Sequence, residues 1–215
     1  MGRSHSPELL DRHELAALVD IADEALLAAL SGMSGGLRSL DSLPPALGAR
    51  RGAFVTLTVD GELNGCIGDI AGRQALGHAV PRLALAAAFD DPRLPALRPD
   101  QYERLAIEVS VLSPLSPVVA ADRGELAAGL RPGIDGLMVG AGHRSGLFLP
   151  DVWDQLPDTD DFLDQLWRKA GLPASTWPDT ILRFTTERLR RGTADTGTPV
   201  PGRRRIAVTG SARAR

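Results

Sequence analysis

The feature that most constrains the fold is an Asp60-Gly61 pair between two strand-forming runs, residues 53–59 (AFVTLTV) and 62–67. Asp-Gly is a preferred two-residue type I′ hairpin turn, because both positions take positive φ. The sequence therefore predicts an antiparallel hairpin. A purely parallel, doubly wound sheet is excluded.

A two-residue turn also sets the register of this hairpin, and Val55 is expected to face Cys66. Side chains alternate between the two faces of a strand. We therefore expect Asn64 and Cys66 to share one face. The other face is expected to carry Leu63, Gly65 and Ile67.

The remaining periodicities predict a chain that alternates helices with strands. Helices are expected over residues 15–29, 74–89, 122–130 and 159–170, the last capped by Asp158 or Thr159. Strands are expected over residues 105–112 and 180–186, and a second hairpin over 134–149 with its loop at 140–145. The fold class is therefore α+β, with a mixed, largely antiparallel sheet and flanking helices.

Composition narrows the function classes. The 215 residues are 43% hydrophobic, which is ordinary for a globular protein, and the single cysteine, Cys66, excludes an intrachain disulfide. The four histidines are scattered without metal-ligand spacing, so we expect no metal site. No apolar run approaches the roughly 20 residues of a membrane span, and the N-terminus has no apolar signal core. A cytoplasmic protein is expected.

Charge is distributed unevenly along the chain. Residues 191–215 carry six Arg and one Asp, a net charge of +5, whereas the whole chain carries −3 and the first 190 residues therefore −8. We expect a folded domain over residues 1–190 and a basic, disordered tail over 191–215. The tail is either merely solvated or a nucleic-acid contact, and the first interpretation is preferred because the tail lacks aromatic residues.

Cys66 is the first candidate for chemistry. A free cysteine on a strand is usually a small buried apolar residue. Here Gly65 and Gly68 flank it, and glycine within a strand often marks the close approach of a ligand or another backbone.

Glu108 is the second candidate, since a carboxylate on a strand must be exposed, paired or functional. Arg93 is a plausible partner for it, either in a structural clamp or in an anion site. Ser110 shares the polar face of the same strand, and Asp91 precedes Arg93 in the turn after the 74–89 helix.

Several segments in order along residues 10–190 resemble the AMMECR domain family, called AmmeMemoRadiSam system protein A in microbes. They are the GAFVTL run at 52–57, GELNGCIG at 61–68, AAFDDPR at 87–93, IEVSVLSP at 107–114, GLFLP at 146–150 and KAGLP at 169–173. One such string is a weak signal, whereas the whole set is specific.

The resemblance implies an α+β fold with a larger and a smaller lobe around a cleft. It also implies genetic association with a Memo-like protein and a radical S-adenosylmethionine protein, but it supplies no reaction and no cofactor. The family usually has Arg where Asn64 stands, so a cation expected on the face of Cys66 is missing here. The ligand-binding residues expected on this basis are Leu63, Asn64, Gly65, Ile67, Gly68, Asp91, Arg93 and Ser110.

Three functions are compatible with these residues, and whether the chain is an enzyme stays open. The first is a cleft-bearing protein that binds a small ligand or a partner, acting with the Memo-like and radical S-adenosylmethionine proteins in modifying a biomolecule. The second is a thiol-dependent enzyme with Cys66 as nucleophile and Glu108 as a proton shuttle. The third is a nucleic-acid-associated protein that uses its basic tail.

Overall fold

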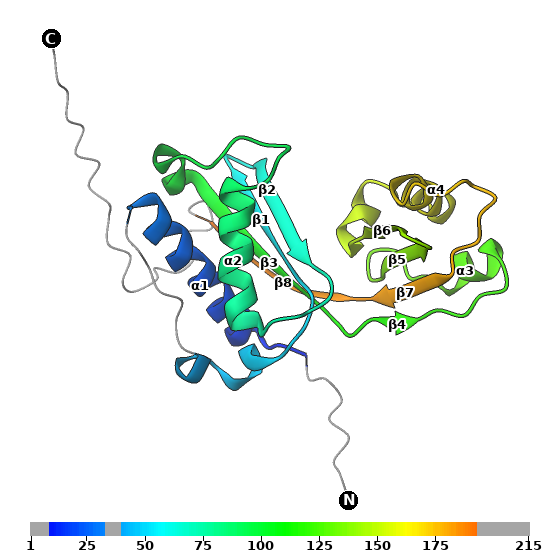
Figure 1. Ribbon diagram of the computed structural model, residues 1–215, viewed down its shortest axis with the longest axis horizontal. Helices are drawn as coiled ribbons and strands as arrows, with labels where there is room; N and C mark the ends of the chain where they lie inside the picture. Colours follow the sequence, from blue (N-terminus) through cyan, green and yellow to red (C-terminus); the bar gives the residue numbers. More distant parts are fainter. Residues whose placement is uncertain (1–8, 33–39, 193–215) are drawn as a thin grey trace, which may run out of the picture.

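The computed structural model describes residues 9–32 and 40–192, which form two lobes, each built on its own antiparallel sheet (Figure 1). The larger lobe has the strand order β2-β1-β3-β8, and the smaller lobe has β4-β7-β5-β6. The predicted α+β class is confirmed. Of the residues expected to form the disordered basic tail, Arg191 and Gly192 lie instead in β8, and those from 193 onward lie outside the described range.

The larger lobe grows from the predicted hairpin. Asp60 (φ 54°) and Gly61 (φ 87°) both take positive φ and join β1 (Ala53–Val59) to β2 (Glu62–Asp69). The sheet is completed by β3 (Leu105–Leu112) and β8 (Thr186–Gly192), and η1 (Leu40–Ser42), η2 (Pro45–Gly48) and η3 (Pro99–Arg104) connect its elements.

Two helices cover one face of this sheet (Figure 1). They are α1 (Arg12–Leu30), which begins with a capping box between Asp11 and Glu14, and α2 (Leu76–Phe89). Alternate residues of β1 are buried beneath them, in the pattern expected of a sheet with one covered face. The opposite face of the sheet carries no helix of the described chain.

The smaller lobe contains β4 (Ser116–Pro117), α3 (Arg123–Gly129), β5 (Gly136–Ala141), β6 (Arg144–Phe148), η4 (Pro150–Asp154), α4 (Thr159–Lys169) and β7 (Thr180–Phe184). Asp158 caps α4, as predicted, by accepting from the backbone N–H groups of Asp160 and Asp161. The second hairpin has a two-residue turn, shorter than the predicted loop, because β5 and β6 extend into it.

Two chain segments and a small apolar cluster join the lobes. The chain leaves the larger lobe after β3 and returns where β7 leads into β8 (Figure 1). At this crossing the Ser113 N–H donates to the Thr185 carbonyl (2.8 Å). Leu112, Leu147 and Phe184 are buried together beside it. The strand β8, which follows this crossing, was not predicted from the sequence.

Candidate functional site

The open face of the larger sheet places Cys66 in a row of polar side chains. Cys66 pairs with Thr56, Thr56 pairs with Glu108, and Glu108 pairs with Arg190, so the four residues cross four adjacent strands. Thr56 and Glu108 are half-buried, and Arg190 is exposed. Neighbouring strands lie about 4.8 Å apart, so Glu108 is two strands away from the thiol.

A β-bulge changes the predicted hairpin register. Thr58 pairs with Leu63 as expected, but Leu57 pairs with Gly65, so Asn64 is an extra residue in β2. Two residues on the bulged strand then oppose one on its partner. The expectation that Asn64 and Cys66 share a face is therefore wrong, and so is the expected pairing of Cys66 with Val55.

The bulge buries Asn64. Only 6% of this residue is exposed, and its Oδ1 atom has no hydrogen-bond partner. Leu63, not Asn64, shares the open face with Cys66. The replacement of the family's usual Arg by Asn64 therefore removes no cation from the face of the thiol in this chain.

The two glycines that flank Cys66 are explained by packing within the protein. A Cβ atom at Gly65 would lie 1.8 Å from the Ala87 carbonyl oxygen of α2. At Gly68 it would lie 2.2 Å from the Phe54 ring. Both glycines thus allow close approach, as their position in the strand indicated, but the approaching groups are a helix backbone and an aromatic ring.

The turn after α2 holds the backbone of Cys66. The Cys66 N–H donates to Asp91 Oδ2 (3.0 Å), and the Cys66 carbonyl accepts from Arg93 Nη2 (3.0 Å). Because β2 is an edge strand, these outward-facing groups would otherwise have no partner in the sheet. Asp91 and Arg93 therefore fix the position of the thiol-bearing residue.

Asp91 and Arg93 also form an ion pair, in which the Asp91 side chain is buried and the Arg93 side chain is exposed. Arg93 donates from Nε and Nη2 to the Asp91 carboxylate (2.9 and 2.7 Å), and the Asp91 side chain is 2% exposed against 62% for Arg93. The hydrogen bonds from Arg93 and from the Cys66 N–H hold the pKa of Asp91 well below its usual range. The same pair raises the pKa of Arg93. The predicted pairing of Arg93 with Glu108 is wrong, because Asp91 takes this role.

Cys66 is half-buried, and its sulfur has a hydroxyl neighbour. Thr56 Oγ1 donates to Cys66 Sγ at 3.2 Å. This hydroxyl gives the sulfur a polar contact on the open face of the sheet. The sulfur is thus neither sealed within the hydrophobic core nor without a polar contact.

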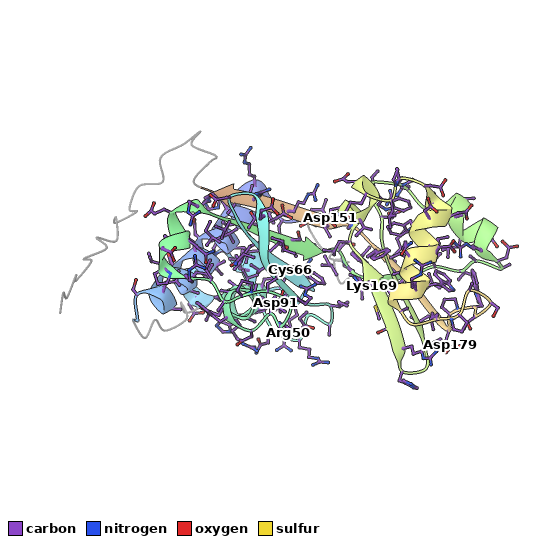
Figure 2. All side chains as sticks on the ribbon, turned by 90° about the horizontal axis from the view of Figure 1, so that it is seen from above. Arg50, Cys66, Asp91, Asp151, Lys169 and Asp179 are labelled. Atoms are coloured by element: carbon purple, nitrogen blue, oxygen red, sulfur yellow. The ribbon has the colours of Figure 1, made fainter. Side chains whose placement is uncertain are left out.

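Lys169 brings a cation from the smaller lobe toward this site. Figure 2 shows it across from Cys66 and Asp91. Its Nζ donates to the Leu147 carbonyl (2.8 Å) and lies 5.0 Å from the centre of the Phe148 ring. Burial of the ammonium group and repulsion from Arg93 lower the pKa of Lys169, while attraction to Cys66 and Asp151 opposes this effect.

The predicted site residues therefore divide into groups. One group is formed by Cys66, Asp91 and Arg93, which lie together. The open face of strand β3 carries Glu108 and the buried Ser110. Leu63 is 48% exposed near the hairpin turn, and Ile67 packs against the core under the helices.

Thr56 and Lys169 were not predicted as site residues, and Arg190, at the far end of the polar row from Cys66, was not predicted to lie on this face. The correct register points to Thr56 and Arg190, and Lys169 carries a signal of its own, since it is the single lysine among 24 basic residues.

The described residues contain neither a cluster of metal ligands nor a membrane-spanning helix. Across residues 9–32 and 40–192, no group of three or more His, Cys, Asp or Glu side chains is placed to hold a metal ion. In the same ranges no helix is both long and apolar enough to cross a bilayer.

Fold and site together define a two-lobed α+β protein with a thiol on the open face of an antiparallel sheet. The AMMECR1 family model matches residues 19–189, and the chain belongs to this family. A protein from Methanothermobacter thermautotrophicus is 39% identical over 182 residues, which cover 83% of this chain and 94% of that protein. Protein MK0488 from Methanopyrus kandleri is 37% identical over 180 residues, covering 79% and 83%.

A solved structure has the same fold. The crystal structure of uncharacterized protein PH0010 from Pyrococcus horikoshii matches with a TM-score of 0.76 and 31% sequence identity, over 84% of this chain and 93% of that one. The resemblance inferred from the sequence segments is thereby confirmed.

Proposed function

We propose that the protein binds a small anionic ligand beside Cys66, in a cleft between the lobes. The observation that carries this proposal is the placement of two cations near the single thiol, Arg93 from the larger lobe and Lys169 from the smaller one. An anion at this position gains from both charges, and the ligand spans the two lobes.

Both cations keep donors available for a ligand. Arg93 uses Nε and Nη2 for Asp91 and Cys66, and no described residue accepts from its Nη1 group. Lys169 uses one of its three N–H donors for the Leu147 carbonyl. Asp91 thus fixes the guanidinium while part of it stays open to solvent.

We further propose that this protein, with its ligand bound, acts with a Memo-like protein and a radical S-adenosylmethionine protein in modifying a biomolecule. The family resemblance supports these partners. A free thiol suits a reducing compartment, which supports a cytoplasmic location. Affinity purification of the tagged chain from its own cells tests the association. Recovery of neither partner, together with empty ligand screens, would count against this function.

The single cysteine allows a direct test of anion binding. We expect iodoacetate, an anion, to alkylate Cys66 faster relative to neutral iodoacetamide than it alkylates a free thiol such as glutathione. Lys169→Met should lower this ratio about threefold or more, because one attractive charge is lost. The two rate constants are measured by mass spectrometry at fixed pH and low salt.

Arg168→Met is the matched control for this experiment. Arg168 is an exposed neighbour on α4 that donates to Gln165, so its loss should leave the ratio unchanged. An equal fall in both variants would indicate a general charge effect. A ratio like that of glutathione in the unmodified protein would refute anion binding at Cys66.

A thiol-dependent enzyme is the second candidate, favoured by the hydrogen bond from Thr56 to the sulfur. Cys66 would attack an activated acyl ester, displace its alkoxide and release the acid after hydrolysis. With p-nitrophenyl acetate we expect an acetylated intermediate on Cys66 and turnover that Cys66→Ser abolishes. Unchanged hydrolysis in Cys66→Ser would exclude this reaction.

A further inference from the structure

A hollow whose lining does not include Cys66 lies where β7 leads into β8. It is a pocket of about 200 Å³ with walls from both lobes. That is the volume of about seven water molecules in the liquid, so a small metabolite fits and a folded partner does not. Thr185 and Thr186 of the connecting segment and Ile134 of the smaller lobe form part of the lining.

Charges of opposite sign line this pocket. Asp151 and Asp154 come from η4 of the smaller lobe, and Arg188 comes from β8 of the larger lobe. All three side chains are exposed, and none has an ion-pair or hydrogen-bond partner among the residues that the structure describes. The carboxylates and the guanidinium therefore face a common space without neutralising one another.

We propose that this pocket binds a small zwitterion of the amino-acid class, with its carboxylate on Arg188 and its ammonium on Asp151 and Asp154. A guanidinium matches a carboxylate through two parallel hydrogen bonds. Two carboxylates against one guanidinium leave the pocket with one excess negative charge. An amino acid with a cationic side chain is thus favoured over a neutral one, and Ile134, which is 50% exposed, offers an apolar contact for methylene groups.

Trp153 provides a reporter for this pocket. It lies in η4 between the two aspartates, and its buried indole N–H donates to the Asp135 carbonyl (2.7 Å). Titration of the ¹⁵N-labelled full-length protein with L-ornithine should shift the Trp153 indole signal in a saturable way. The signal of Trp177, in the segment between α4 and β7, should stay in place.

Variants and half-ligands test the assignment of charges. Arg188→Gln and the double change Asp151→Asn with Asp154→Asn should each weaken ornithine binding about tenfold. Arg188→Lys should retain part of the affinity, which separates loss of charge from loss of fold. L-alanine should bind more weakly than ornithine, and propylamine or propionate more weakly still.

Arg190→Gln is the matched control, because Arg190 lies on the same strand and face but donates to Thr58 Oγ1. The affinity of the Arg190→Gln variant for ornithine should equal that of the unmodified protein. The proposal is overturned by an absent or unsaturable Trp153 shift, by propylamine binding as tightly as ornithine, or by an equal loss in Arg190→Gln. The reporter lies in η4 and the alkylation test reads Cys66, so failure of this proposal and failure of the anion site are observed separately, although Asp151 lines the pocket and also acts on Lys169.

Discussion

At the scale of single residues, Lys169 is the exception in a chain that otherwise uses Arg for every basic side chain. Arg keeps its charge at any ordinary pH, whereas Lys changes its protonation readily when it is partly buried. The structure places this one ammonium group across from the one thiol. Arg93 repels the ammonium group, and Asp151 attracts it. A site that needs an adjustable charge would favour Lys at this position.

The pKa of Lys169 is expected to respond to its neighbours in opposite directions. Cys66→Ser should lower this pKa, because the attraction of the thiolate is lost. Arg93→Met should raise it, because repulsion is relieved and the charge of Asp91 is exposed. With ¹³C-labelled lysine the protein gives one side-chain signal, and its NMR titration measures the pKa directly.

Arg168→Met serves as the control for this titration as well, and the Lys169 signal should titrate as in the unmodified protein. Shifts of the same sign in Cys66→Ser and Arg93→Met would contradict the proposed arrangement of charges.

Gly65 allows a contact that no other residue permits. The Cβ of alanine would meet the Ala87 carbonyl oxygen, a backbone atom that cannot move aside. Gly65→Ala should therefore lower the free energy of unfolding by about 3 kcal/mol or more, measured by urea denaturation. Gly129→Ala at the end of α3 has open space around it and should be neutral or stabilising. Equal stability of both variants would argue against the close packing of β2 on α2.

At the scale of elements, β2 is an edge strand with two irregularities close to Cys66. The bulge at Asn64 shifts the register, and the Asp91–Arg93 pair occupies the outward-facing backbone groups of Cys66. An edge strand that is capped in this way cannot pair with a further strand at that point. The turn after α2 thus protects the edge and fixes the thiol at the same time.

Asp91→Asn should destabilise the protein by about 2 kcal/mol near neutral pH, because hydrogen bonds to a charged group are weakened. The folded pKa of Asp91 is depressed, so its contribution is fully present above the unfolded value of about 4. It is lost as the pH falls below that value toward the folded pKa. The stability difference from the unmodified protein should be constant between pH 8 and 5 and shrink below pH 4.

Asp100→Asn is the control for this pH series, since Asp100 pairs with Arg98 at a well-exposed position. Such pairs contribute little to stability. A difference for Asp91→Asn that is small at pH 7, or that grows in acid, would exclude the proposed role of Asp91.

At the scale of the whole molecule, both proposed sites depend on the arrangement of the two lobes. The thiol site takes Lys169 from the smaller lobe, and the pocket takes Arg188 from the larger one. The lobes meet through the buried Leu112, Leu147 and Phe184 and through the connecting segments. Asp151 belongs to both regions, because it lines the pocket and its charge acts on Lys169.

Binding of a ligand in the pocket should therefore change the pKa of Lys169. Asp151 raises the pKa of Lys169, so an ornithine ammonium placed beside Asp151 should lower that pKa by a fraction of a pH unit. The single lysine signal, titrated with and without saturating ornithine, measures this change. Asp151→Asn should lower the pKa in the absence of ornithine and abolish the response to it. A response that persists in this variant would show that the coupling follows another route.

Much of the fold was predictable because it rests on local signals. The Asp60-Gly61 turn and the Asp158 cap both act within a few residues, and both were predicted correctly. The bulge at Asn64 has no comparable sequence signature, and the predicted register failed there. β8 was not predicted because both of its faces carry charged residues. Glu187 and Arg191 lie on the face opposite the open one, where apolar residues would normally indicate a strand.

The sequence by itself determined an antiparallel α+β chain, its family and the residues most suited to chemistry, since turn geometry and motif order are local properties of the chain. Only the tertiary structure decided which side chains face Cys66, because one inserted residue in β2 reverses the face of each preceding side chain relative to those that follow. It also placed Lys169 of the smaller lobe where its charge interacts with Arg93 and Cys66 of the larger lobe, a proximity that sequence separation conceals.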